Sequence, residues 1–191
     1  LYGLGGTFTN YGALAVVQTP TGGGVTGWTI GSSGSLRGLF QQDLSTAYEF
    51  GSTSTVGLAL NVSGTVTGWS VDAGIPKVFT SSLGATPSVF DASTLFPGYL
   101  GTAGTGINSN GVVTGWAIDA SGIKHAWVGN GSVPVDLNAL IPTALAASGT
   151  AINSSGNVVG WVQNNTNGLT TGFYFNGSSA SLIGGTVTAT A

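Results

Sequence analysis

The sequence contains no cysteine and no methionine, and charged residues make up only 5% of its 191 residues. The absence of cysteine excludes disulfides, thiolate metal sites and a cysteine nucleophile. With three basic residues there is no basic stripe, so nucleic acid is not an expected partner. No uninterrupted apolar run reaches the roughly 18 residues that a membrane-spanning helix needs, so no membrane span is expected.

The composition indicates a globular chain with a polar but largely uncharged surface. Hydrophobic residues make up 41%, and glycine alone accounts for 34 residues. Such a surface is wetted by hydroxyls and amides rather than by ions, which suits a protein that assembles, coats a surface or works outside the cell. Because methionine is absent, Leu1 is not an initiator residue. We therefore expect an extracellular or cell-surface location after removal of a signal peptide.

A Gly-Trp pair recurs four times, with Trp spacings of 41, 47 and 45 residues. The pairs are Gly27-Trp28, Gly68-Trp69, Gly115-Trp116 and Gly160-Trp161. A glycine stands five residues before each Trp: Gly23, Gly64, Gly111 and Gly156. An asparagine stands eight before it in three copies, as Asn61, Asn108 and Asn153, and the first copy has a longer loop instead. Repetition at a fixed period indicates an array of one structural unit.

The downstream half of the repeat also recurs. An aromatic residue follows each Trp by ten to twelve positions, and an Asp-Leu-like element comes after it in most copies. The aromatic residues are Phe40, Phe79, Trp127 and Phe173. Each copy divides into four short β-branched or aromatic runs separated by turn residues, which is the pattern of one propeller blade.

The sequence therefore predicts an all-β protein, a single four-bladed β-propeller domain over residues 1–191 built from four Gly-Trp repeats of about 45 residues. The repeats cover about 11–55, 56–102, 103–147 and 148–191. The four Trp residues and the downstream aromatic residues are predicted to pack between blades, and the Gly before each Trp to allow close strand approach. An exposed aromatic row that stacks on sugars is the alternative interpretation of the Trp residues.

The third copy carries the motif most fully. It contains Gly106-Ile107-Asn108, then Gly111-Val112-Val113-Thr114-Gly115-Trp116, and then Lys124-His125-Ala126-Trp127 and Asp136-Leu137. This pattern resembles the HAF family of extracellular repeats. The resemblance implies a secreted bacterial protein with propeller-like repeats and no well-defined catalytic activity. The family's His-Ala-Phe survives only as His125-Ala126-Trp127, so no role for the histidine carries over to the other copies.

The two ends of the chain carry similar segments. Leu4-Gly5-Gly6 resembles Ile183-Gly184-Gly185, so the sequence begins and ends at the same point of the repeat. Residues 1–10 are therefore predicted to form a strand that either closes the ring by completing the last blade or exchanges between molecules.

Chemistry-bearing residues are sparse. His125 is the only histidine, and no Gly-x-Ser-x-Gly element is present to form a triad with it. Asp72 and Asp119 occupy the same turn position, for which turn capping is favoured over calcium binding. Asp91 and Asp136 are the weak candidates for paired glycosidase carboxylates. We predict no enzyme activity and no metal or cofactor.

Asparagine-rich turns produce five Asn-x-Ser/Thr triplets, which are read as turns rather than as glycosylation sites. Their asparagines are Asn61, Asn130, Asn153, Asn164 and Asn176. The function predicted from these features is a secreted structural subunit of a fibre, matrix or surface layer that self-associates. The alternative is an adhesive module that binds a surface glycan.

Overall fold

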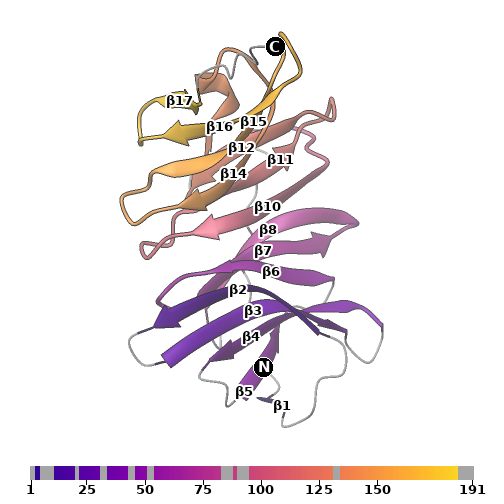
Figure 1. Ribbon diagram of the computed structural model, residues 1–191. Helices are drawn as coiled ribbons and strands as arrows, with labels where there is room; N and C mark the ends of the chain where they lie inside the picture. Colours follow the sequence, from indigo (N-terminus) through magenta and orange to yellow (C-terminus); the bar gives the residue numbers. More distant parts are fainter. Residues whose placement is uncertain are drawn as a thin grey trace, which may run out of the picture.

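The computed structural model describes residues 3–4, 11–19, 22–30, 34–42, 46–50, 54–82, 88–89, 95–130 and 134–184. The chain is all-β, as predicted, and its strands form four antiparallel sheets (Figure 1). Within the described ranges, the one helical element is the short 3-10 helix η2, Asn138–Leu140. Residues 137–147 form η2 followed by the start of a strand, and Pro142 between them cannot continue a helix.

The first two sheets come from the first half of the chain. The first sheet has the order β1-β5-β4-β3-β2 and consists of β1 (Gly3–Leu4), β2 (Tyr11–Thr19), β3 (Gly22–Ile30), β4 (Leu36–Gln42) and β5 (Thr46–Phe50). The second consists of β6 (Thr55–Leu60), β7 (Thr65–Asp72), β8 (Ile75–Ser82) and β9 (Ser88–Val89), in that order.

The second half of the chain forms the other two sheets in the same way. The third sheet consists of β10 (Gly101–Ile107), β11 (Val113–Ile118), β12 (Lys124–Gly129) and β13 (Val135–Asp136). The fourth consists of β14 (Ala144–Ile152), β15 (Val158–Asn164), β16 (Thr170–Phe175) and β17 (Ala180–Ile183). Each sheet therefore corresponds to one sequence repeat, with its strands in chain order except that β1 is added beside β5 in the first sheet.

The turn that precedes each Gly-Trp pair has the predicted conformation in three repeats. Gly64, Gly111 and Gly156 have φ values of +75°, +76° and +84°, which only glycine adopts without strain. In the first repeat, Gly23 lies within β3, opposite Gln18 of β2. The longer loop of that repeat thus becomes an extension of the β2–β3 hairpin.

The glycine of each Gly-Trp pair lies against a β-bulge, and the prediction that it permits close strand approach is confirmed in the last three sheets. The strand pairing shifts by one residue at Gly57/Ala59, at Gly104/Gly106 and at Gly149/Ala151. A Cβ on Gly68, Gly115 or Gly160 would run into a carbonyl oxygen of the preceding strand. Only glycine fits there.

The core lies between successive sheets. Strand β6 packs across β2, β3 and β4 of the first sheet, β10 packs across the second sheet, and β14 packs across the third. The predicted core position of the downstream aromatics is confirmed: Phe40, Phe79, Trp127 and Phe173 are 4%, 0%, 2% and 0% exposed. The four Trp residues of the Gly-Trp pairs are only half-buried, so the predicted packing of these side chains between blades is incomplete.

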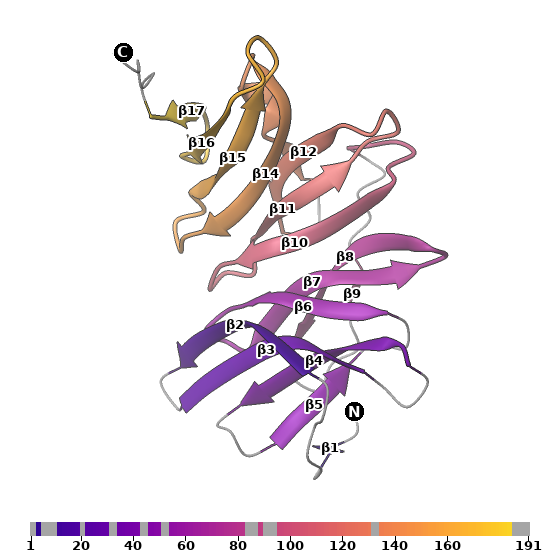
Figure 2. The same ribbon diagram turned by 45° about the vertical axis from the view of Figure 1, so that its right-hand side comes forward.

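The four sheets follow one another as an open stack, with the first and last sheets at opposite ends in both views (Figures 1 and 2). Four antiparallel sheets confirm the repeat architecture, but no ring closes among the described residues. Each sheet after the first packs on the sheet before it through its own first strand.

The N-terminal strand joins the first sheet. In β1, Gly3 pairs with Tyr48 and Leu4 with Ala47 of β5, so β1 does not complete the last blade. At the other end, Ile183 closes β17 opposite Gly172, and Gly184 follows it with a φ of +102°. Gly5, Gly6 and Gly185 lie outside the described residues. Exchange of these end segments between molecules stays a prediction.

Candidate functional site

A ladder of asparagines connects the last three repeats. Asn61 and Asn108 use the side-chain oxygen to accept two backbone N–H groups of their own turn, which lie two and four residues further on. The side-chain nitrogen then reaches the next sheet: Asn61 Nδ2 donates to the Asn108 carbonyl (2.9 Å), and Asn108 Nδ2 donates to the Asn153 carbonyl (3.0 Å). Both side chains are buried, so these bonds link neighbouring sheets away from water.

Asn153 repeats only half of this arrangement. Its Oδ1 accepts the N–H groups of Ser155 (3.0 Å) and Asn157 (2.9 Å), which orients the carboxamide as in the other two turns. The residue is exposed, because no sheet follows the fourth in the described chain. Within that part of the chain, its Nδ2 has no acceptor. The last rung of the ladder therefore presents an oriented donor to solvent.

A second contact recurs at the centre of each sheet interface. It joins a threonine, two residues before the Trp of one sheet, to a glycine in the first strand of the next sheet. A Cβ on Gly57, Gly104 or Gly149 would collide with the hydroxyl of Thr26, Thr67 or Thr114, respectively. Glycine at these positions thus lets the next strand lie directly on the threonine.

The threonine hydroxyl is itself fully engaged. Thr26, Thr67 and Thr114 are each 0% exposed, and they donate to the carbonyls of Leu39 (2.9 Å), Phe79 (2.8 Å) and Trp127 (2.8 Å). These carbonyls belong to the neighbouring strand of the same sheet. This hydrogen bond satisfies the hydroxyl within its own sheet. The hydroxyl can therefore be buried against the glycine of the next sheet without a hydrogen-bond partner there.

The fourth sheet lacks this threonine. Val159 takes its place on β15, opposite Tyr174 of β16, and it is 41% exposed. Tyr174 and Ile183 are also exposed, and the register of β15, β16 and β17 places all three on one face, along with half-buried Trp161. We call this surface, with Asn153 at its margin, the open face.

The fourth sheet supplies no charged residue to the open face, although Lys124 of the third sheet places its Nζ 5.9 Å from the Trp161 ring centroid. Residues 137–191 contain no Asp, Glu, Lys, Arg or His, so the fourth sheet is uncharged throughout. Edge strands and exposed sheet faces are usually protected from association by charged residues, above all lysine. The open face thus combines exposed apolar side chains with an oriented amide donor, and its own sheet has no charged residue.

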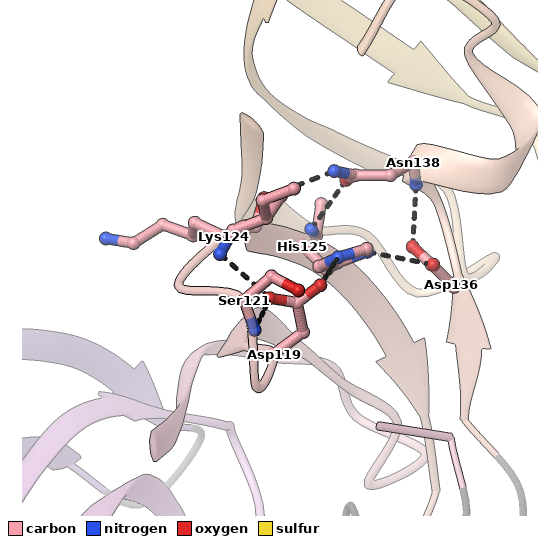
Figure 3. Close-up of polar contacts among 8 residues, drawn as sticks. Asp119, Ser121, Lys124, His125, Asp136 and Asn138 are labelled. Atoms are coloured by element: carbon pink, nitrogen blue, oxygen red, sulfur yellow. Dashed lines mark hydrogen bonds and ion pairs between the residues drawn. The ribbon is translucent and has the colours of Figure 1, made fainter. Parts of the chain in front are cut away.

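The only histidine of the chain lies between two carboxylates in the third sheet (Figure 3). His125 Nδ1 is 2.9 Å from Asp136 Oδ2, and Nε2 is 3.3 Å from Asp119 Oδ2. The ring also packs against Phe96, with centroids 4.9 Å apart. A neutral imidazole has one N–H and donates to one carboxylate at a time, whereas an imidazolium donates to both.

Both carboxylates also hold the backbone. Asp119 Oδ1 accepts the N–H groups of Ser121 and Ile123, each at 2.9 Å, which confirms the predicted turn cap. Burial alone would raise the pKa of Asp119, but these backbone bonds and the His125 ring outweigh burial and lower the pKa below its usual value. Asp136 Oδ1 accepts the N–H of Asn138, at the start of η2. The cluster thus fastens a turn and an edge strand to β12.

Asp72 differs from Asp119 although the two share a position in the repeat. Its carboxylate accepts a hydrogen bond from Lys77 Nζ (2.6 Å) in a largely exposed ion pair. The chain turns at Ala73 and Gly74, both with positive φ, so the backbone itself makes this hairpin. The capping prediction therefore holds for Asp119, whereas Asp72 pairs with Lys77. Asp91, the other candidate acid, lies outside the described residues.

The Asn-x-Ser/Thr triplets, which are interpreted as turns, fall in different surroundings. Asn61 is 5% exposed and bonded to the next sheet, so its side chain is closed to modification in the folded chain. Asn130, Asn153 and Asn176 are exposed. Asn176 accepts bonds from the backbone and hydroxyls of Ser178 and Ser179 in its hairpin, in keeping with a turn role.

No site for a metal or for membrane insertion by a helix emerges from the described residues. They include no group of three or more His, Asp or Glu side chains placed to hold a metal ion. They also include no helix of the length and apolar character needed to cross a membrane.

Comparison with known proteins leaves the family open. No protein-family model matches the chain, and no curated protein matches it. Among solved structures, a fucose lectin from Kordia zhangzhouensis, in complex with methyl-fucoside, is similar at a TM-score of 0.35 and 10% identity, over 92% of this chain and 99% of that one. A TM-score this low establishes neither a shared fold nor a shared ligand.

Proposed function

We propose that this chain is a secreted, non-enzymatic structural protein of the HAF-repeat type. Its molecules associate through the open face into a fibre, matrix or surface layer outside the cell. The observation that carries the proposal is the open face itself. It presents the asparagine donor, which is covered at two interior interfaces, and the strand position that a buried threonine holds at all three, and among the described residues they meet no further sheet.

The composition supports the same function. A protein that remains dispersed at high concentration usually relies on surface charge. This chain has nine charged residues in all, and none lies beyond residue 136. Burial of the open face would therefore bring no charged residue of the fourth sheet out of water, and the Asn153 amide would gain an acceptor.

Association can be measured directly on the purified chain. We expect light scattering and sedimentation to show a mass that rises with concentration, and electron microscopy to show regular assemblies. Val159→Lys places a charge at the centre of the open face and should return the chain to monomers. Val62→Lys is the matched control, because Val62 is 47% exposed but lies in the β6–β7 turn.

The outcomes separate clearly. Dispersed monomers of the unmodified chain at every concentration would overturn the proposal. Equal association of both lysine variants would show that the open face is not the contact.

A second candidate function is glycan binding by an adhesive module. It is favoured by the half-buried indoles of Trp116 and Trp161, which lie near the Nζ of Lys124 (4.7 and 5.9 Å from the two ring centroids). Aromatic rings of this kind offer flat apolar surface at low entropic cost. A glycan array probed with the unmodified chain and with Trp161→Ala tests it: no hits, or hits unchanged in the variant, would remove this candidate.

A further inference from the structure

We propose that the partner of the open face is the first sheet of a second copy, so that molecules join head to tail and continue the stack. This inference rests on the proposed function and names the surface that meets the open face.

The interior interfaces are directional. At all three, a sheet contributes a threonine side chain and the next sheet contributes a glycine. At the last two, the sheet also contributes an asparagine side chain, and the next sheet contributes a backbone carbonyl. The two partners therefore use different surfaces. A continuation of this pattern requires, opposite the open face, the first strand of another sheet.

The chain contains one sheet whose first strand is not used in this way. Strands β6, β10 and β14 each cover the sheet before them, whereas β2 begins the first sheet and no described sheet precedes it. The two unused surfaces belong to opposite ends of the stack (Figures 1 and 2). A second copy is thus the natural source of the missing partner.

Both end sheets differ from the interior sheets at the positions that form the threonine–glycine contact. The β2–β3 pairing shifts between Ala13 and Ala15, as the pairing of the later hairpins shifts at their glycines. Ala13 thus takes the register position of Gly57, and Val159 takes the position of the threonine. The strand position opposite the interior threonine and the threonine itself are therefore both replaced at the two ends.

The asparagine ladder can also continue across such a junction. Asn61 and Asn108 each donate to a backbone carbonyl, which any residue supplies. The loss of the asparagine from the first repeat therefore removes no acceptor. A back-to-back dimer of two open faces would instead set Val159 against Val159 and bring two Asn153 donors together. Head-to-tail contact satisfies the donor and, because it does not close, builds a filament.

The absence of native cysteine allows a clean test. Val159→Cys and Ala13→Cys are made separately, mixed in equal amounts under assembling conditions and treated with a short bismaleimide linker. We expect linked pairs containing one chain of each variant, identified by mass spectrometry, to exceed Val159→Cys homodimers several-fold. The double variant should give a ladder of linked oligomers. Val62→Cys mixed with Ala13→Cys is the matched control and should give only background linkage.

Each contrary result has its own meaning. Predominant Val159→Cys homodimers would show back-to-back contact and overturn the inference while association remains. An internally linked monomer from the double variant would show a closed four-bladed ring and also overturn it. If linkage stays at background while the molecules still associate, the contact between them involves other surfaces, and the inference is overturned. If light scattering finds only monomers of the unmodified chain, the proposed function fails as well.

Discussion

Asn108 donates a side-chain hydrogen bond of 3.0 Å to the backbone carbonyl of Asn153, and this bond ties the third repeat to the fourth. The same side chain accepts the N–H groups of Asn110 and Val112 in its own turn. One carboxamide thus both shapes a hairpin and joins two sheets. It is 4% exposed in Asn108 and exposed in Asn153, which makes the pair a natural comparison.

Replacement of Asn108 by alanine should therefore cost more than replacement of Asn153. Asn108→Ala strands two turn N–H groups and a carbonyl away from water, and we expect a loss of about 1–3 kcal/mol of unfolding free energy. In Asn153→Ala, water replaces the lost partner, so the loss should be about 0.5–1 kcal/mol. Urea unfolding followed by tryptophan fluorescence measures both. Equal losses would contradict the role assigned to the inter-sheet bond.

The Gly149–Thr114 contact predicts a second effect. Gly149→Ala would place its methyl group on the Thr114 hydroxyl, and we expect a loss of about 1–3 kcal/mol from overpacking. Thr114→Ala in the same chain removes that hydroxyl, so the double variant should lose less than the sum of the single variants. Gly172→Ala is the control, because its Cβ would have 3.4 Å of clearance from Ile183. Additive losses would show that the two sheets do not meet at this point.

Local features of the repeat were predictable from the sequence, and long-range ones were not. Gly111 needed positive φ because it ends an Asn-x-x-Gly turn, and this depends on neighbouring residues alone. The burial of Phe79 and Phe173 followed from their recurrence. The contact of Thr67 with Gly104 is marked in the sequence, since a threonine and a glycine recur at these positions in each interior copy. Predicting the contact, however, requires knowing which face of one sheet meets the next. Ring closure depends on angles summed over all interfaces, which no local pattern specifies.

The histidine cluster shows the same limit. Along the sequence, His125, Asp119 and Asp136 looked scattered, and turn capping was correctly predicted for Asp119 alone. The hairpin between β11 and β12 brings Asp119 to one ring nitrogen, and the edge pairing of β13 brings Asp136 to the other. Only the strand register makes these three residues neighbours.

Asp119 should make the free energy of unfolding of the chain depend on pH in the acid range. Its pKa is lowered in the folded chain, so the folded state binds fewer protons than the unfolded state and acid favours unfolding. The carboxylate's contribution should be full above the unfolded aspartate pKa of about 4 and should disappear as the pH falls through the lower folded value. Unfolding midpoints of the unmodified chain and of Asp119→Asn should therefore differ at pH 7 and converge towards pH 3. A constant difference across this range would contradict the prediction.

Removal of the ring donors should loosen the third sheet. His125→Phe keeps an aromatic ring against Phe96 but leaves the facing oxygens of Asp119 and Asp136 without their shared partner. We expect a loss of about 1–3 kcal/mol, because hydrogen bonds to charged groups are stronger than neutral ones. Hydrogen exchange should rise most at the Ser121 and Asn138 amides. Unchanged exchange there would show that backbone pairing alone holds these segments.

An exchange of residues between Thr114 and Val159 isolates what the open face lacks. Thr114→Val removes the hydroxyl that donates to the Trp127 carbonyl, and at 0% exposure of Thr114 the lost hydrogen bond should cost about 1 kcal/mol. Val159→Thr should be nearly neutral in the monomer, because the site is 41% exposed and the register offers the Phe173 carbonyl to the new hydroxyl. Chemical unfolding at low concentration measures both effects. If Val159→Thr destabilises the dilute monomer as much as Thr114→Val does, then Val159 already packs within its own chain and the face we describe as open is covered.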